Sequence, residues 1–311
     1  MVFAVIDLGT NTFNLLIGET LPNNTFRRLF NTRISVKLGE GTINSGYIAD
    51  APFQRGIHAL KQYQQYMLDY NVEKEFAFAT SAIRSASNGP EFVKEAFEKA
   101  GITVTVIDGN EEAELVYYGN RMAVNMSEKI SLIMDIGGGS TEFILANKDT
   151  IFWKQSFKLG AARLLDKFRP CNPITEAEVG AFHTYLYQEL EPLRQAVKQY
   201  KPIELIGSSG AFDSVVDLIG GEFDHTLVND AQTEYPISLA EYQLISNKIK
   251  ASTLQERYDM PYLIHMRADM MVISIMLIDF VLSEIGLQTF RTSTFSLKEG
   301  VISKKLGLSL R

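Results

Sequence analysis

The sequence predicts an α/β protein whose second half repeats the first. Strand patterns alternate with helix patterns through residues 1–124, and the same alternation restarts after Met126. One short stretch also occurs twice, 128 positions apart, as Asp7-Leu-Gly9-Thr-Asn-Thr12 and as Asp135-Ile-Gly137-Gly-Gly-Ser140. A repeat in register, followed each time by an apolar strand, indicates two copies of one structural unit.

In the first half, three successive strands precede a helix–strand–helix–strand–helix run, which differs from a plain doubly wound sheet. The apolar run Val2–Ile6 and the alternating run Ile102–Ile107 are typical of strands. We expect strands near 2–9, 12–20, 26–37, 74–80 and 102–107, and helices near 51–70, 90–100 and 110–124.

The second half begins with three more strand patterns, and no Pro-, Gly- or Ser-rich linker separates it from the first, which predicts a packed hinge near 123–128. The apolar segment Met270–Leu282 contains Asp279 and is shorter than the roughly 20 residues that span a bilayer, so we expect a buried helix. A final helix near 296–306 is expected to cross back to the first half. The remaining expected elements are strands near 129–136, 141–147, 150–158 and 203–207, and helices near 160–168 and 175–199.

Composition excludes several classes of function. The chain has 311 residues and a formal net charge of −7, which argues against a large nucleic-acid surface, because a basic field supplies most of that affinity. The N-terminal strand has no basic region or cleavage site of a signal peptide, and the single cysteine, Cys171, forms no intrachain disulfide. We therefore expect a cytoplasmic protein that binds neither nucleic acid nor membrane.

The repeated turns are suited to phosphate chemistry. Each one reads as a β-hairpin whose turn presents backbone N–H groups beside one carboxylate, Asp7 or Asp135. Glycine lets the backbone approach an anion closely, and a carboxylate at the turn can hold a hydrated Mg²⁺. A single Asp-x-Gly turn is also an ordinary hairpin turn without a ligand, so the duplication carries the inference. The candidate phosphate-binding residues in the turns are Thr10, Asn11, Thr12, Gly137, Gly138, Gly139, Ser140 and Thr141.

Further polar residues follow other strands. Arg84, in the stretch Thr80–Asn88 at a strand-to-helix turn, is an anion-binding candidate or a surface arginine. Glu111 and Glu112 open a helix, where acids also stabilise the dipole, but a carboxylate at a strand end beside the hinge could place a water molecule. Glu142 follows the second turn, either as a candidate metal ligand or as a solvated residue on the polar face of a strand. Residues 206–210 form a third glycine-rich turn, which is weak evidence by itself.

The histidines suggest no metal site. His58, His183, His225 and His265 show no metal-ligand spacing and have no nearby cysteine. Arg267 precedes the buried helix, and we expect it to pair with an acid at the junction of the two halves.

Together these stretches resemble the exopolyphosphatase and guanosine pentaphosphate phosphohydrolase (Ppx/GppA) family, within the actin-like ATPase and sugar-kinase superfamily. The resemblance extends over nearly the whole chain in the expected order, and residues 135–142 are its most specific part. The matching stretches are 6–12, 33–41, 79–84, 109–113, 135–142, 159–163 and 297–300.

The resemblance implies two actin-like, ribonuclease H-like domains with mixed sheets around a cleft. It places them at 1–124, joined by the C-terminal helix at 298–311, and at 125–297. It also implies Mg²⁺ or Mn²⁺, and release of the terminal phosphate from inorganic polyphosphate or guanosine pentaphosphate by water attack. By the same resemblance, Glu112 of the pair Glu111 and Glu112 is the catalytic acid that places the water. Arg84 falls on a phosphate position, and Asp7, Asp135 and Glu142 are the metal candidates.

The chain also departs from the family pattern. Residues 207–212 differ from the usual Gly-x-Gly-Gly-Thr, which affects the expected recognition of a nucleoside. The C-terminal helical domain of longer members is expected to be absent, which would shorten any polyphosphate channel. The alternatives are a small-molecule kinase of the same superfamily and an actin-like nucleotide-dependent binding module. The substrate could be either polyphosphate or guanosine pentaphosphate, and a homodimer is compatible with the resemblance.

Overall fold

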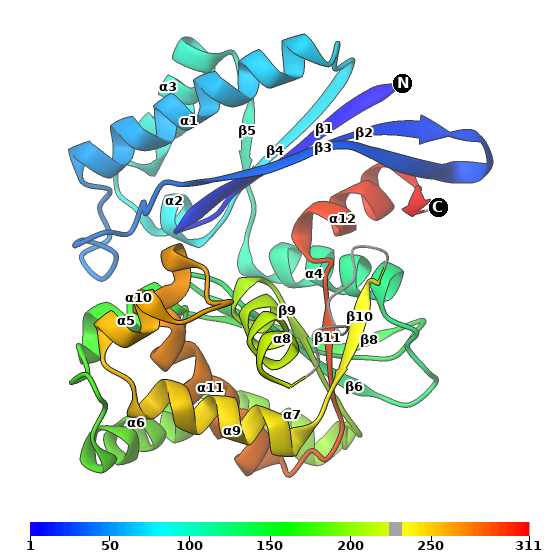
Figure 1. Cartoon of the computed structure of the whole chain (residues 1–311). Helices are drawn as coiled ribbons and strands as arrows, with labels where there is room; N and C mark the ends of the chain where they lie inside the picture. Colours follow the sequence, from blue (N-terminus) through cyan, green and yellow to red (C-terminus); the bar gives the residue numbers. More distant parts are fainter. Residues whose placement is uncertain (224–231, 311) are drawn as a thin grey trace.

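The computed structural model describes residues 1–223 and 232–310, which form two domains that each contain a six-stranded mixed sheet (Figure 1). The first sheet has the order β12-β3-β2-β1-β4-β5, and the second has the order β10-β11-β9-β6-β7-β8. The first contains β1 (Val2–Leu8), β2 (Thr12–Leu21), β3 (Thr25–Ser35), β4 (Lys74–Ala79), β5 (Val104–Val106) and β12 (Ser309–Leu310). The second contains β6 (Ser131–Ile136), β7 (Thr141–Ala146), β8 (Ile151–Phe157), β9 (Leu205–Ser208), β10 (Glu234–Ile237) and β11 (Phe290–Ser293).

Strand pairing repeats between the two sheets. In the first sheet β1–β2 and β2–β3 are antiparallel, whereas β1–β4 and β4–β5 are parallel. In the second sheet β6–β7 and β7–β8 are antiparallel, whereas β6–β9 and β9–β11 are parallel. The predicted repeat of an α/β unit with a mixed sheet is therefore confirmed. The division into 1–124 and 125–297 stays a prediction.

Helices cover both sheets and also lie between them. Figure 1 shows α4 and α12 in the space between the two sheets, and their apolar side chains share one buried cluster with residues of both sheets. The first domain contains α1 (Asp50–Asp69), α2 (Ser81–Ser85), α3 (Gly89–Ala100) and α4 (Gly109–Ala123). The second contains α5 (Ala161–Phe168), α6 (Glu176–Glu189), α7 (Glu191–Tyr200), α8 (Gly210–Glu222), α9 (Leu239–Ala251), α10 (Leu254–Asp259) and α11 (Ala268–Ile285).

The C-terminal helix returns to the first domain, as predicted. It consists of α12 (Leu297–Val301) and a π-helical turn, η3 (Ile302–Leu306). Its contact with α4 needs glycine, because a Cβ at Gly300 would lie 1.7 Å from the Leu115 carbonyl oxygen and one at Gly119 would lie 2.0 Å from that of Ser296. This close approach fixes residues 296–299 beside the first strand of the chain.

Some predicted boundaries are wrong. The helix expected at 175–199 is two helices, α6 and α7, because Pro192 lies at the start of α7 and cannot donate the backbone N–H that a continuous helix requires. The strand expected at 102–107 pairs with β4 only over Val104–Val106. The expected buried helix is confirmed as α11, and no helix in the described part of the chain is long and apolar enough to cross a membrane.

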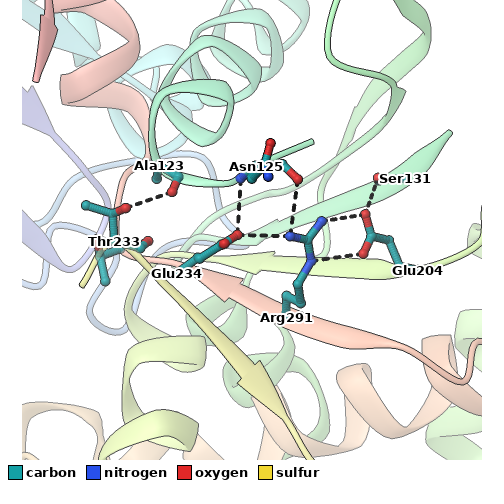
Figure 2. Close-up of polar contacts among 8 residues, drawn as sticks. Ala123, Asn125, Ser131, Glu204, Thr233, Glu234 and Arg291 are labelled. Atoms are coloured by element: carbon teal, nitrogen blue, oxygen red, sulfur yellow. Dashed lines mark hydrogen bonds and ion pairs between the residues drawn. The ribbon is translucent and has the colours of Figure 1, made fainter. Parts of the chain in front are cut away.

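The expected hinge region is held by a polar network (Figure 2). Arg291 on β11 donates from Nε and Nη2 to Glu204, at 2.9 and 2.7 Å, and from Nη1 to Glu234, at 2.9 Å. Glu234 also accepts from the backbone N–H of Asn125, at 3.2 Å. Breaking a buried ion pair of this kind is strongly destabilising, because it leaves an uncompensated charge. The connection between α4 and β6 is therefore firmly attached to the second sheet.

Candidate active site

The two repeated turns have the same geometry. The N–H of Gly9 donates to the carbonyl oxygen of Thr12 at 3.1 Å, and the N–H of Gly137 donates to that of Ser140 at 3.0 Å. Across each hairpin the aspartate lies opposite a polar residue, since Asp7 pairs with Asn14 and Asp135 with Glu142. The sequence repeat is thus a structural repeat of two equivalent hairpin turns.

The turns lie in contact with each other at the floor of the cleft. A Cβ at Gly138 would lie 2.6 Å from Nδ2 of Asn11, and one at Gly139 would lie 2.6 Å from both Oγ1 of Thr10 and Oγ of Ser81. A larger residue at either position would require the facing side chains of Thr10, Asn11 or Ser81 to shift. The predicted phosphate-binding residues of the two halves are therefore brought together. The two turns touch and do not face each other across a gap.

The two aspartates lie in enclosed surroundings. Burial raises the pKa of Asp7 to about 6; the negative charges of Asp135 and Glu299 act in the same direction, and the Lys298 ammonium opposes them. Asn14 donates from Nδ2 to Oδ2 of Asp7 at 3.1 Å.

Asp135 is held by hydroxyl groups. It is 5% exposed and accepts from Ser209 Oγ at 2.8 Å and from Ser296 Oγ. Burial raises the pKa of Asp135, and the two hydroxyl donors lower it. Because Ser296 precedes α12 and Ser209 precedes α8, the position of this carboxylate depends on segments from distant parts of the sequence.

Glu112 and Arg84 form a buried ion pair beside the turns. Arg84 Nη1 donates to Oε2 of Glu112 at 2.8 Å and to the carbonyl oxygen of Ile107 at 3.0 Å. Glu112 is 8% exposed, and burial raises its pKa to about 7 even though the Arg84 charge and hydrogen bond lower it. A carboxylate with this pKa can accept a proton near neutral pH.

Glu142 lies next to this pair from the second domain. It is 1% exposed and accepts from Ser156 Oγ at 2.6 Å. Burial raises the pKa of Glu142 well above its usual range, and the negative charges of Glu112 and Asp135 raise it further. The carboxylates of both domains therefore act on one another electrostatically.

This donor set fits a hard divalent cation. It consists only of carboxylate oxygens, and the charge of Asp135 raises the pKa of both Asp7 and Glu142, which a nearby cation would reverse. Among the described residues no three His, Cys, Asp or Glu side chains form a ready metal cage. The set therefore fits Mg²⁺, which retains water and is usually bound by one or two carboxylates together with substrate phosphates.

A cleft of about 1010 Å³ opens on one side of the turns. Six predicted site residues line it, namely Asp7, Thr10, Asn11, Thr12, Gly137 and Gly138. Other predicted residues, including Glu112, Arg84 and Glu142, do not line this cleft. The structure therefore divides the predicted residues into an open group and an enclosed group.

Several predicted residues have other surroundings. The Thr141 hydroxyl donates to the carbonyl oxygen of Leu159 at 2.9 Å, and this side chain is fully buried. The backbone N–H of Glu111 donates to the side chain of the helix-capping Asp108 at 2.8 Å, and its own side chain has no hydrogen bond or ion pair to another described residue. Arg267 donates to Asp213 at 3.1 Å in the cleft wall, so its expected pairing with an acid is confirmed. His225 lies outside the described residues.

The sequence analysis assigned no role to four residues at the site, although Ser209 and Lys298 lie in stretches that it singled out. Asn14, Ser209 and Ser296 hold the aspartates, and Lys298 lines the cleft near Asp7. Asn14 could have been found from the repeat, because it occupies the position that Glu142 has in the second copy. Ser296 and Lys298 come from the C-terminal segment, whose place beside Asp7 depends on the tertiary fold.

Comparison with known proteins agrees with this geometry. Residues 19–309 match the model of the Ppx/GppA phosphatase family. The chain belongs to the Ppx/GppA phosphatase family. The earlier resemblance and the predicted two-domain actin-like fold are thereby confirmed.

Relatives support this assignment. The crystal structure of an exopolyphosphatase from Cytophaga hutchinsonii matches with a TM-score of 0.96 and 39% identity, covering 99% of each chain. A putative exopolyphosphatase from Haemophilus influenzae is 25% identical, over 96% of this chain and 90% of that protein. A bifunctional 3-dehydroquinate synthase/phosphatase from Fusobacterium nucleatum is 35% identical, over 53% of this Ppx/GppA chain and only 26% of that longer protein.

Proposed function

We propose that this Ppx/GppA protein hydrolyses a terminal phosphoanhydride bond, releasing phosphate from inorganic polyphosphate or guanosine pentaphosphate. The observation that carries the proposal is the buried pair of Glu112 and Arg84 next to two glycine turns in contact, one from each domain. The 39% identity to an exopolyphosphatase over almost the whole chain supports the same reaction.

In this proposal Glu112 orients the attacking water and accepts its proton. The water oxygen forms a bond to the terminal phosphorus, the bond to the bridging oxygen breaks, and that oxygen remains on the shortened chain with its negative charge. Arg84 orients Glu112 and offers a second guanidinium nitrogen to the phosphoryl group. The N–H groups of the two turns bind the charge that develops on the equatorial oxygens.

Asp7, Asp135 and Glu142 are the residues that would hold Mg²⁺ or Mn²⁺. When bound, the metal neutralises phosphate charge and polarises the phosphoryl oxygens. Asn14, Ser209 and Ser296 fix the two aspartates through the hydrogen bonds given above.

The test is phosphate release from polyphosphate, guanosine pentaphosphate and ATP, each with and without an alcohol acceptor. The proposal predicts phosphate release from at least one of the first two substrates without any acceptor. A rate that requires an alcohol, with transfer of the phosphoryl group to it, would instead identify a small-molecule kinase. Nucleotide binding without turnover would identify an actin-like binding module.

A weak dependence of binding on salt and chain length is also expected. Of five basic residues expected near the cleft, Arg84, Lys37 and Arg267 form ion pairs with acids, and Arg163 binds carbonyl oxygens. Of these five, only Arg33 has neither kind of partner among the described residues, and Arg28 and Lys298 also line the cleft without such a partner. Each cation that neutralises a phosphate makes affinity fall more steeply as the salt concentration rises. With few cations available, affinity should fall only gently with salt, and to a similar extent for short and long polyphosphates.

Binding measured across a salt series with polyphosphates of two lengths would check this prediction. Affinity that increases progressively with chain length and collapses in moderate salt would indicate an extended basic channel, for example one formed across a homodimer. Cytoplasmic location and dimer formation are further proposals, which cell fractionation and sedimentation would test.

A further inference from the structure

The carboxylates Glu112 and Glu142 do not line the cleft. Glu112 and Glu142 come from different domains and are only 8% and 1% exposed. In the proposed function a water molecule and a terminal phosphate must reach Glu112. The domains must therefore separate to admit the substrate and return to this arrangement for reaction, which raises the question of which contacts hold them together.

One arginine bridges the domains at the side opposite the hinge. Arg163, on α5, donates from Nε to the carbonyl oxygen of Gly139 at 2.9 Å, within the second turn. From Nη1 it donates to the carbonyl oxygen of Ile43 at 2.9 Å and to Oδ1 of Asn44 at 3.3 Å, both in the first domain. A single guanidinium group thus joins the phosphate-binding turn of one domain to a loop of the other.

Asn44 completes the contact from the other side. Its Nδ2 donates to Oδ2 of Asp166 at 2.8 Å and to the carbonyl oxygen of Arg163 at 3.2 Å. Asn44 lies in the loop between β3 and α1, which we call the 36–49 loop. This loop is anchored in the first domain by the buried side chains of Leu38 and Ile48. In Figure 1 it reaches toward α5, on the side away from α12 and β11.

The positive charges near Arg163 make closure of the cleft depend on a bound anion. Burial lowers the pKa of Arg163, and the positive charge of Arg84 from the other domain lowers it further. Two guanidinium groups that approach as the cleft closes repel each other. An anion such as the terminal phosphate reduces this repulsion, so that closure is favoured when substrate is present.

We propose that Arg163 is a positioning residue that closes the cleft, by tying the second glycine turn to the 36–49 loop once a phosphate lies between the domains. The proposal rests on the proposed function for its role in turnover. The bridge itself can be tested without turnover.

The test measures the distance between the domains directly. The single cysteine, Cys171, is exposed in the second domain, and Lys61→Cys adds an exposed site on α1 of the first. Spin labels at both sites report the interdomain distance by pulsed EPR in the presence of Mg²⁺ and inorganic phosphate. We expect a short, narrow distribution in this labelled protein and a longer, broader one after Arg163→Ala. Arg163→Lys should not restore the short distance, because one ammonium group cannot reproduce the two-sided contact.

Lys167→Ala is the control. Lys167 is exposed on the same helix, and its Nζ lies 4.0 Å from the centre of the Tyr185 ring in its own domain, so its removal should leave the distance unchanged. Asn44→Ala changes an exposed side chain and removes three of the interdomain hydrogen bonds. It should lengthen the interdomain distance in part, and it keeps the test available even if Arg163→Ala fails to fold.

Activity gives a second readout. Arg163→Ala should lower kcat/KM for tripolyphosphate about 10-fold or more, the size expected when the three hydrogen bonds of a charged donor are lost. Unchanged distance distributions in Arg163→Ala and Asn44→Ala would overturn the proposal, whatever the rates. Absence of hydrolysis in the unmodified protein would contradict the proposed function instead, and would leave the distance result intact.

Discussion

Glu112→Gln is expected to lower kcat about 10²-fold or more while the fold and substrate binding are retained, because the amide cannot accept the proton of the attacking water. Glutamine has the shape of glutamate and can still accept a hydrogen bond from Arg84, which lies 2.8 Å away. The measurement is kcat and KM for tripolyphosphate, together with the melting temperature. Glu111→Gln is the matched control, since the neighbouring side chain has no partner at the site among the described residues.

The same assignment predicts a pH dependence. The pKa of Glu112 is raised to about 7, and the base is active only when ionised, so the rate should fall as pH drops below about 7. This fall in rate below about pH 7 should be absent from the residual activity of Glu112→Gln. Wild-type turnover in that variant, or an unchanged acid limb, would remove Glu112 from the proposed role.

Asp7→Asn and Asp135→Asn should each abolish metal-dependent hydrolysis. The charge of Asp135 raises the pKa of Asp7, and the two residues belong to turns in contact, so one metal–phosphate complex is expected to use both. Their effects should be strongly non-additive, because either loss disables the same unit. Residual rates of both single variants and the double variant would be measured over a range of Mg²⁺ concentrations.

Asp149→Asn, at an exposed position between β7 and β8, is the control for the loss of one negative charge. Since Asn keeps the volume of Asp, the buried sites should not collapse, and circular dichroism would verify this. Hydrolysis that persists in a chelator, or simple additivity in the double variant, would count against a shared metal site.

The repeat was the part of the fold most accessible from sequence. Because Asp7 and Asp135 begin two similar stretches, the strand–turn–strand units could be predicted without any structure. The break between α6 and α7 was missed, although Pro192 marks it, because apolar periodicity continues across the junction. The hydrogen-bonded length of β5 was also missed, since its partner β4 limits it.

The site was predictable only where its residues belong to local motifs. Glu112 and Arg84 could be named from their stretches, but their ion pair depends on how α4 and α2 pack against β4 and β5. Lys298 and Ser296 escaped notice because they are brought to Asp7 and Asp135 by the return of α12, which local patterning does not encode. The contact between the two turns likewise follows from domain closure, and the glycines at 138 and 139 only permit it.

The central claim, water attack on a terminal phosphorus, is tested most directly by hydrolysis in ¹⁸O-labelled water. Tripolyphosphate would be allowed a single cleavage, and the released phosphate and the remaining diphosphate would be analysed by mass spectrometry. Attack on the terminal phosphorus predicts one ¹⁸O atom in the released phosphate and none in the diphosphate. Label in the diphosphate, or no cleavage unless an alcohol accepts the phosphoryl group, would contradict the account.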